Sequence, residues 1–381
     1  MLGILPVALL LQAGATPLAA APAPAGRAIA ESYERTYDEV MGMRPLADKA
    51  AQVQDLVIVR DAARFTLKRG TMHLVSPVNG RTVAAVFHGA GAFALRPTNP
   101  IERRRLARIE SAESIDAPVT DVVFFFADST LAQLERTLAF ASGPVTGELR
   151  DRIEDALELV GDRDTRTIDP DLMAAMLNGE DNDLFYACIR RQSGGPLLFM
   201  LNPNEVESVR LAGRVTRRVW SRATEMITQF PRNGGVRPAG ATGDRTRQAD
   251  VQRYVIETWL PQTGMGEIGF SAAATLEIIA DQPVGPWVTF ELFDRLKVDS
   301  ARWAGGEPAT VFRAKDADLL WVKLDGRIRP GDVRTLQLWY HGDLIDRFED
   351  FFQIKSSAAW YPRSLEGRSL ARFDLTFHTW D

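Results

Sequence analysis

The most constraining feature of the sequence is the recurrence of apolar side chains at every second position in its last third. Such alternation occurs at 276–280, 288–292, 320–324, 336–340 and 373–377. Successive side chains of a strand point to opposite faces, so each segment predicts a strand with one buried face. Turn clusters such as Gly305-Gly306, Asp325-Gly326 and Pro330-Gly331 separate the segments, and no helical pattern intervenes. This spacing predicts an antiparallel β-sandwich over residues 250–381.

The preceding region, 27–235, mixes strand and helix periods. A helix is predicted over 28–43, and strands at 72–75 and 82–87 flank Asn79-Gly80. Both turn residues tolerate positive φ, so this pair predicts a hairpin. Asn99-Pro100 is typical of a helix start, with a capping residue followed by proline.

Further along, the uninterrupted apolar run Val122–Phe126 predicts a central strand buried on both faces. Helices are predicted after Ser129, over 149–160 and from Asp169-Pro170 to Gly179, and a strand over 197–201. The overall prediction is a mainly β (α+β) fold, with a mixed β/α leading domain followed by the sandwich.

The chain is long enough for two domains, because 381 residues exceed the ~250–300 that one hydrophobic core usually organises. Residues 231–250 contain Gly-Gly, Arg-Pro and two further glycines with hardly an apolar side chain. This composition predicts a linker or a long exposed loop between the two domains.

Residues 1–26 have the pattern of an export signal. An apolar stretch over 2–11 is followed by small residues such as Ala19-Ala20-Ala21. The stretch is shorter than the ~20 residues that a membrane-spanning helix needs. We therefore expect a secreted or periplasmic protein without a transmembrane segment.

Charge excludes one class of partner. The formal net charge is −5, and basic and acidic residues are interspersed along the chain. Nucleic-acid binding requires a concentrated basic face, so we expect no nucleic-acid partner.

The sequence contains no recognisable zinc-peptidase motif. Its four histidines, at positions 73, 88, 341 and 378, lie far apart and within predicted strands or at their ends, and H-E-x-x-H is absent. Asp162, Asp164 and 181–183 offer oxygen ligands for calcium, but without EF-hand spacing, so caps and loop acids are the favoured interpretation.

Other chemistry is equally hard to assign. The segment Phe87–Ala94 matches a loose G-x-G-x-x-A pattern, yet no helix opens from its glycines, so a bulge or close backbone packing is predicted instead. Ser271 lacks the second glycine of a nucleophile elbow. The single cysteine, Cys188, is predicted to be a core residue. We assign no catalytic, cofactor-binding or metal-binding residue.

Several tryptophans leave two interpretations open. They lie at positions 287, 303, 321, 339 and 360. One interpretation is a surface that binds carbohydrate or peptide. The other is that these side chains fill the sandwich core or cover its open end.

A family resemblance rests on three segments near the end of the chain: Leu336–Gly342, Ala359–Arg363 and Phe373–Phe377. They resemble the amino-terminal β-domain of the aminopeptidase-N-type zinc metallopeptidases, where a strand ending in Y-x-G precedes a proline-containing loop and an F-x-L-x-x strand. The region from Leu67 to Phe126 also looks like an extra leading domain of some exported bacterial members.

The resemblance implies a non-catalytic amino-terminal portion of a metallopeptidase-like protein, truncated before the zinc domain. Zinc is implied only for that missing catalytic domain. The family places a glutamine or acid near the proline loop, and Gln353 is the nearest residue here, but its surroundings do not repeat the pattern, so no binding residue is carried over. The implied partner is a docking catalytic domain or a peptide or protein substrate. The alternative is a free-standing exported sandwich that binds peptide or glycan.

Three structural expectations follow. The chain alone should bind no stoichiometric zinc. Trp360, Tyr361 and Pro362 should lie in a partly exposed loop near the docking face. Phe373, Leu375 and Phe377 should share one face of a paired strand, with Arg372, Asp374, Thr376 and His378 on the other face.

Overall fold

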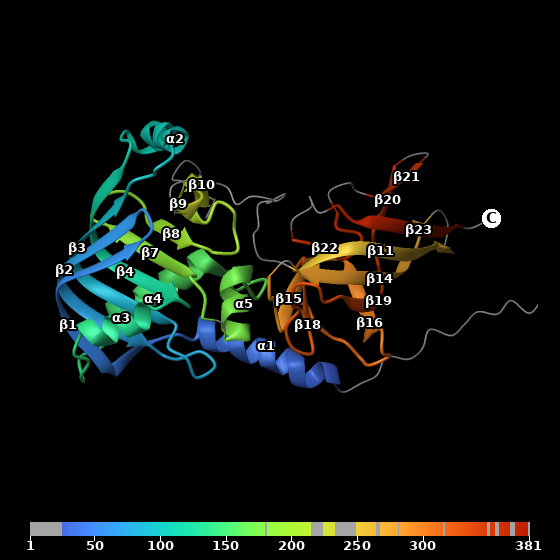
Figure 1. The fold of residues 1–381 in the computed structure, drawn as a ribbon, viewed down its shortest axis with the longest axis horizontal. Coiled ribbons are helices and arrows are strands. Elements are labelled where there is room, and N and C mark those ends of the chain that lie inside the picture. The colour runs from blue at the N-terminus through green and yellow to red at the C-terminus, as the bar shows by residue number, and fades with distance from the viewer. Residues whose placement is uncertain are drawn as a thin grey trace, which may run out of the picture.

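The structure, a computed structural model, contains two β systems with helices between them (Figure 1). It describes residues 25–179, 181–214, 224–232, 249–263, 267–280, 282–314, 317–348, 351–354, 358–365 and 370–379. The predicted export signal and the predicted linker lie almost wholly outside these residues. Within the described part of the chain, no helix combines the length and apolar character that crossing a membrane demands.

The first system is an eight-stranded sheet with the order β1-β2-β3-β4-β7-β8-β9-β10. All its neighbouring strands are antiparallel. The strands are β1 (Pro45–Arg60), β2 (Ala63–Val75), β3 (Ala84–Leu95), β4 (Ile115–Phe126), β7 (Phe185–Arg191), β8 (Leu197–Leu201), β9 (Val209–Arg214) and β10 (Thr224–Phe230). As predicted, Val122–Phe126 is central and buried throughout.

The predicted helices are confirmed. They are α1 (Ala25–Met41), α2 (Pro100–Glu110), α3 (Thr130–Thr137), α4 (Gly147–Val160) and α5 (Pro170–Asn178), and a short ribbon of β5 (Gly161–Asp162) and β6 (Thr167–Ile168) joins the last two. Asn99 caps α2 and Asp169 caps α5 through their side chains. Ser129 precedes α3 but its side chain makes no cap bond; Asp128 Oδ1 accepts from the Thr130 amide instead.

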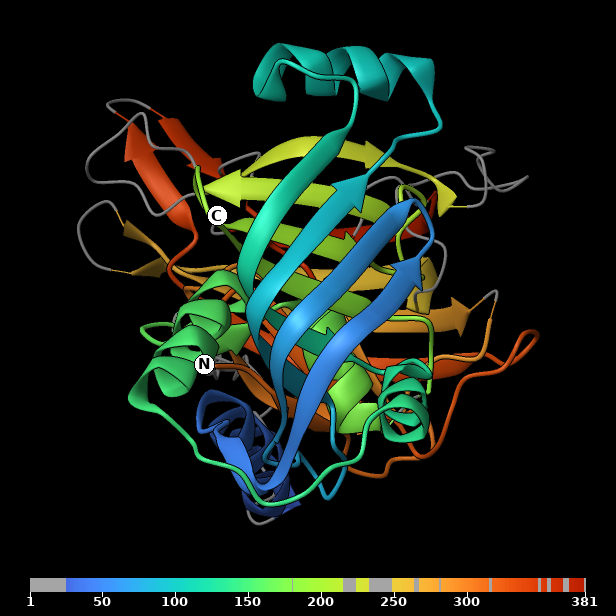
Figure 2. The ribbon, with the colours of Figure 1, turned by 90° about the vertical axis from the view of Figure 1, so that its left-hand side faces the viewer.

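The first sheet bends back on itself. Strands β2 and β8 are four steps apart in the sheet, which would separate them by about 19 Å if it were flat. Yet the rings of Phe65 on β2 and Phe199 on β8 lie 6.0 Å apart. Figure 2 shows β1–β4 crossing in front of β7–β10. The fold encloses a phenylalanine-rich core to which α2 and α3 also contribute, while α1, α4 and α5 pack on the opposite face.

Local turn chemistry agrees with the sequence. The hairpin between β2 and β3 turns at Asn79 and Gly80, which have φ of 47° and 76°. The glycines of Phe87–Ala94 lie in β3 at a register shift, as predicted, and Gly89 lies opposite Gly70 of β2. A Cβ on Gly70 would come within 2.2 Å of the His88 carbonyl oxygen, so backbone proximity excludes a side chain.

The second system is the predicted sandwich of two sheets. One sheet has the order β16-β19-β14-β11-β23 and the other β17-β18-β15-β22. The first contains β11 (Ala249–Leu260), β14 (Phe270–Ala280), β16 (Leu296–Trp303), β19 (Arg334–Gly342) and β23 (Arg372–Thr379), and the second contains β15 (Trp287–Glu291), β17 (Thr310–Phe312), β18 (Leu319–Lys323) and β22 (Arg363–Ser364). Two short hairpins are appended, β12 (Gln262–Thr263) with β13 (Glu267–Ile268) and β20 (Ile345–Phe348) with β21 (Phe351–Ile354).

The sandwich departs from the prediction in one pairing. The expected topology is antiparallel, and the other strand pairs of both sheets are so, but β23 runs parallel to β11. The alternating positions of β14 face the core as predicted, with every second residue buried from Phe270 to Ala280.

The outer face of the smaller sheet is covered by the first system. Trp287 and Trp321 join the core cluster of α1, α4 and α5, whereas Val288 and Val322 on the inner face join the sandwich core. The Asn178 side chain donates to the Trp287 carbonyl (3.3 Å) and accepts from its amide (2.8 Å). Of the five tryptophans singled out in the sequence, 287 and 321 are therefore buried between the two systems, and 303, 339 and 360 are partly buried.

Candidate docking surface

One exposed apolar feature of the sandwich is a face of strand β23. Phe373, Leu375 and Phe377 are 43%, 45% and 47% exposed. The strand register places them beside Tyr254, Ile256 and Thr258 of β11, all of which are buried. The three side chains therefore lie on the inner, core-facing side of the larger sheet and still remain open to solvent.

The lengths of the facing strands explain this exposure. Strand β22, at the neighbouring edge of the smaller sheet, contains only two residues and pairs with β15 through Ser364 and Arg363. Strand β23 contains eight residues. The smaller sheet consequently ends before it covers β23, and an inner face that alternation predicts as core has no opposing layer among the described residues.

Two aromatic residues border the exposed strand. Tyr361 lies 5.4 Å from the Phe373 ring and Trp360 lies 6.3 Å from the Phe377 ring, centroid to centroid. Both are partly exposed in a loop leading into β22, as predicted, while Pro362 is buried. We call Trp360, Tyr361, Phe373, Leu375 and Phe377 the β23 face.

The opposite side of β23 is polar, as predicted. The carboxylate of Asp374 accepts from Arg253 at 2.6 Å, and His378 Nε2 lies 2.8 Å from Glu257 Oε1. The His378 ring also stacks on Trp259. The alternating sequence therefore predicts correctly which side chains of β23 share a face. The burial of the apolar face, which the same pattern implies, is not observed.

A second exposed aromatic group lies on the β20–β21 hairpin. Phe348, Phe351 and Phe352 are all exposed, and the first two rings stack at 5.7 Å. Gln353 lies on the same hairpin and is exposed. The structure gives it no contact that would assign it to a site.

The four histidines are held in separate places. His73 is buried, with Nδ1 3.2 Å from the Leu46 carbonyl oxygen. His341 pairs with Asp299 on the larger sandwich sheet, and His378 pairs with Glu257. In the described part of the chain, His88 is the histidine that lies close to two acidic side chains, as a metal site would require.

His88, Asp121 and Glu148 have ligand atoms within 4.8 Å of one another. The pairing of β3 with β4 sets His88 directly opposite Asp121, and Nδ1 lies 2.7 Å from Oδ1. Arg152 of α4 donates to Glu148 at 2.9 Å and places Nε 3.5 Å from Asp121. Since this guanidinium already neutralises the carboxylates, the residues fit an ion-pair network and do not fit a zinc site.

The sequence does not predict this network. It offers His88 as a possible ligand, but it gives no signal that joins Asp121 or Arg152 to it. Their proximity depends on the register of two strands separated by helix α2, and on α4 packing across β4. No local spacing in the sequence indicates either.

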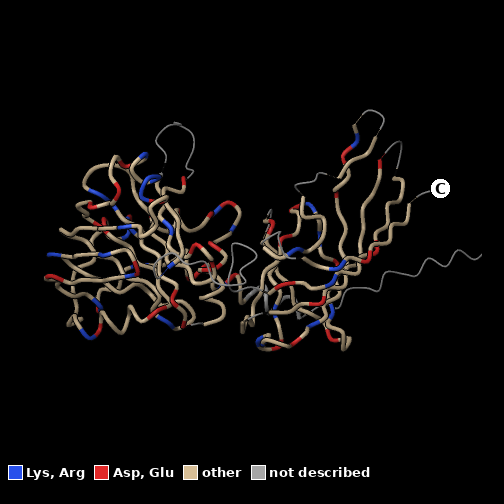
Figure 3. The backbone as a smooth tube through the Cα atoms, turned by 45° about the horizontal axis from the view of Figure 1, so that its top comes forward, with Lys and Arg blue, Asp and Glu red and all other residues tan. Residues whose placement is uncertain are grey.

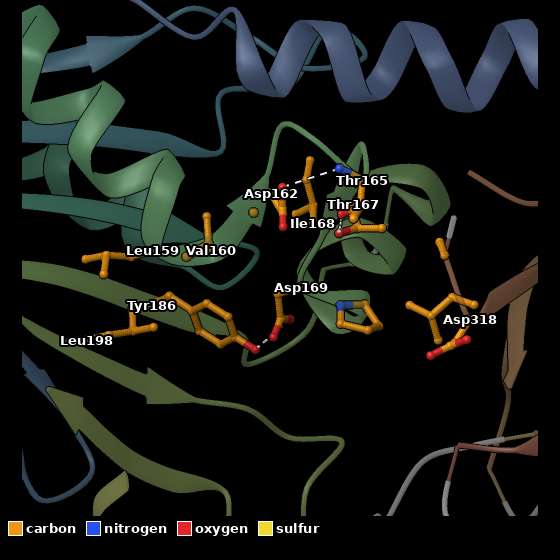
Figure 4. A pocket seen from close by; sticks show the side chains of 14 residues that line it. Leu159, Val160, Asp162, Thr165, Thr167, Ile168, Asp169, Tyr186, Leu198 and Asp318 are labelled. Carbon is orange, nitrogen blue, oxygen red and sulfur yellow. Dashed lines mark hydrogen bonds between the residues drawn. The ribbon is translucent and has the colours of Figure 1, made fainter. Parts of the chain in front are cut away.

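A pocket of about 460 Å³ lies where the β5–β6 ribbon approaches the sandwich (Figure 4). Asp169 and Tyr186 line it from the first system, and Asp318 from the sandwich. Asp162 accepts the amides of Asp164 and Thr165, and Asp169 accepts the Tyr186 hydroxyl at 3.0 Å. These acids hold a turn and a helix end in place, which leaves no nucleophile–base pair in the pocket.

The remaining candidates also have structural roles. Asp181 pairs with Arg81, Asp183 pairs with Arg232, and Asn182 accepts the Leu184 amide. Cys188 is buried in the core as predicted, and burial raises the pKa of its thiol. Charged residues of both signs are scattered over the two systems (Figure 3).

Comparison with known proteins gives a partial likeness. No family model matches the chain, and no curated protein does. An M1 zinc metallopeptidase from Deinococcus radiodurans is similar at 28% identity over 26% of this chain and 21% of its own, with a TM-score of 0.22. A mutant M1 zinc metallopeptidase from the same organism, bound to a Tyr-Ser-Ala substrate, is similar at 24% identity over 36% and 33%, with a TM-score of 0.25.

The matched part is therefore about a fifth to a third of those structures' length. At these TM-scores, the function has to be argued from the residues of the chain itself.

Proposed function

We propose that this chain is a non-catalytic, metallopeptidase-like module that binds the catalytic part of a zinc peptidase through the β23 face. The catalytic part would be supplied by further polypeptide or by another chain. Action outside the cytoplasm, predicted from residues 1–26, belongs to this proposal. The observation that carries it is the inner face of β23, apolar and open to solvent.

Burial of this face would release free energy. Exposed apolar patches on a folded protein commonly mark an interaction site, because covering each square ångström contributes about 25 cal/mol. Phe373 and Phe377 would each bring a large ring surface, and Trp360 and Tyr361 enlarge the patch. Large aromatic side chains of this kind dominate the binding energy of protein interfaces.

The chemistry of the face favours a polypeptide over a glycan. A glycan presents many hydroxyl groups that must exchange hydrogen bonds with water for hydrogen bonds with protein. Three of the four inward positions of β23 are Phe, Leu and Phe, without a donor or acceptor on the side chain, and the fourth is Thr379 at the end of the strand. The polar groups of this strand lie on the other side, where Asp374 and His378 are already paired.

Two observations support a catalytic centre outside this chain. The sequence lacks H-E-x-x-H, and its histidines are spread over separate strands of the two systems. The grouping around His88 already contains the guanidinium of Arg152. These residues support a role for the chain in positioning a catalytic partner.

The proposal is tested by finding and adding that partner. The DNA after the codon for Asp381 and the neighbouring reading frames are searched for H-E-x-x-H with a later glutamate, and the encoded domain is produced together with this chain. We expect a complex on gel filtration, zinc only in the added domain, and hydrolysis of aminoacyl anilides only in its presence.

A matched pair of variants locates the contact. Leu375→Lys places a charge in the centre of the β23 face and should abolish co-elution. Val333→Lys alters a similarly exposed apolar residue elsewhere on the sandwich and should leave the complex intact. Absence of such a reading frame, equal loss in both variants, or equimolar zinc in the chain alone would contradict the proposal.

A further inference from the structure

Among the described strands, β23 is the edge strand of the larger sandwich sheet. Within the described part of the chain it pairs with β11 alone, and all eight of its residues are exposed. One row of its backbone amide and carbonyl groups therefore faces away from the sheet. Such a row is a template for a further strand.

The edge also lacks three of the features that usually prevent pairing. Natural edge strands are protected by proline, by a bulge, or by a charged side chain pointing inward. Residues 372–379 contain no proline, and their register with β11 is unbroken from Arg372 to Thr379. The inward positions carry Phe373, Leu375, Phe377 and Thr379, none of which is charged, so no charge opposes an added strand.

The strand is complementary to itself. Phe373 and Phe377 are placed symmetrically about Leu375. In an antiparallel pair centred on Leu375, each Phe373 would lie opposite Phe377 of the second copy, and the two leucines would meet at the axis. Directly opposed aromatic and aliphatic pairs of this kind stabilise sheets.

The polar side is compatible with the same register. Asp374 would lie opposite Thr376 of the second copy, and Arg372 opposite its His378. Asp374 already pairs with Arg253, and His378 already lies against Glu257, so neither strand presents an unpaired acid to the other. Among the described residues, the Arg372 side chain makes no hydrogen bond or ion pair, so its guanidinium is able to reach the His378–Glu257 pair of the second copy.

We propose that β23 pairs antiparallel with β23 of a second copy about a two-fold axis at Leu375. The five-stranded sheets of the two copies would then form one continuous sheet. This contact uses the backbone edge of β23, whereas the proposed catalytic partner would cover its side-chain face. The inference therefore goes beyond the proposed function and does not depend on it.

The first measurement is the mass of the purified chain by analytical ultracentrifugation over a concentration series. We expect a reversible shift from 42.2 kDa toward twice that mass. Leu375→Lys introduces the inward charge that natural edges carry, and should lower the association constant by roughly tenfold or more. Val333→Lys should leave the association constant unchanged.

Cysteine cross-linking then tests the register. Antiparallel partners have Cα atoms about 4.5–5.5 Å apart, within the range of a disulfide. Leu375→Cys should therefore form a covalent dimer with itself under mild oxidation. Phe373→Cys should not, but should cross-link to Phe377→Cys when the two variants are mixed. The native Cys188 is buried, so the unmodified chain serves as the control for cross-linking that does not involve β23.

A chain that stays monomeric throughout the concentration series and gives no Leu375→Cys dimer would overturn the inference. So would equal cross-linking of Leu375→Cys and a Val333→Cys control, which indicates random collision. Both measurements use the chain alone. Their failure therefore leaves the catalytic-partner proposal standing, and failure to bind a catalytic domain leaves this inference standing.

Discussion

Asp169 shows how much of this fold depends on single acceptor groups. One carboxylate oxygen accepts the amides of Asp171 and Leu172 at the start of α5 and also the Tyr186 hydroxyl. Two residues on, Asp171 accepts from Asn202 and Asn204 at 2.7 and 2.8 Å. Helix α5 is thereby fixed to β7 and to the loop after β8.

Asp169→Ala should lower the free energy of unfolding by about 2–4 kcal/mol, since it removes a helix cap and leaves the buried Tyr186 hydroxyl without its acceptor. Asp169→Asn keeps an oxygen in the same position and should lose less. Urea denaturation followed by circular dichroism measures both. Equal losses of stability in the two variants would show that the negative charge of Asp169, and not its role as a hydrogen-bond acceptor, stabilises the fold.

At the scale of elements, the backbones of β2 and β3 approach each other too closely at Gly70 for a side chain to fit. Gly70→Ala would bring a methyl group to 2.2 Å from the His88 carbonyl oxygen. Relief requires the strands to separate, so we expect loss of more than about 2 kcal/mol or failure to fold. Gly305→Ala serves as the control, because nothing lies within 4 Å of the added carbon there. Thermal unfolding of both proteins distinguishes a specific contact from a general cost of losing glycine.

Elements specified by local chemistry were predictable from the sequence. The Asn79-Gly80 hairpin, the capped starts of α2 and α5, and the alternating strand β14 all depend on neighbouring residues only. Strand β1, in contrast, is not indicated by the sequence. Its sixteen residues include many exposed polar positions, and it is a strand because β2 pairs along nearly its whole length.

Contacts between distant elements could not be predicted from the sequence. Alternation distinguishes the two faces of β15 and β18, but it does not say that Trp287 and Trp321 meet α1 and α5. Nor does it say that the inner face of β23 extends past the short β22, which is the origin of the candidate docking surface. Both depend on where another layer ends.

At the scale of the whole molecule, the two β systems share a core. Tyr33 of α1 stacks on Phe312 of β17 at 4.1 Å and lies 5.6 Å from Trp321. Together with the two hydrogen bonds between Asn178 and Trp287, this contact holds the sandwich against the helices. We therefore expect the described parts to unfold together and not one after the other.

The tyrosines can report on this cooperative unfolding, because they lie in both β systems and the pKa of each of the six is raised. Burial is the main cause for each of them: Tyr33, Tyr37, Tyr186, Tyr254, Tyr340 and Tyr361. An unfolded tyrosine ionises near pH ~10. A folded pKa above that value stabilises the protein fully below pH ~10, and the contribution is lost as the pH rises toward the folded pKa.

Alkaline titration should therefore unfold the protein as it ionises its tyrosines. We expect the tyrosinate absorbance to rise above pH ~10 in step with the loss of near-ultraviolet circular dichroism, since ionising Tyr186 or Tyr340 in place would bury an uncompensated charge. The same chain in guanidinium chloride should titrate independently of any structural signal, near the ordinary pKa. Six tyrosines ionising near pH 10 with the dichroism intact would show that water reaches these hydroxyls, and that the shared core between the two β systems is not closed.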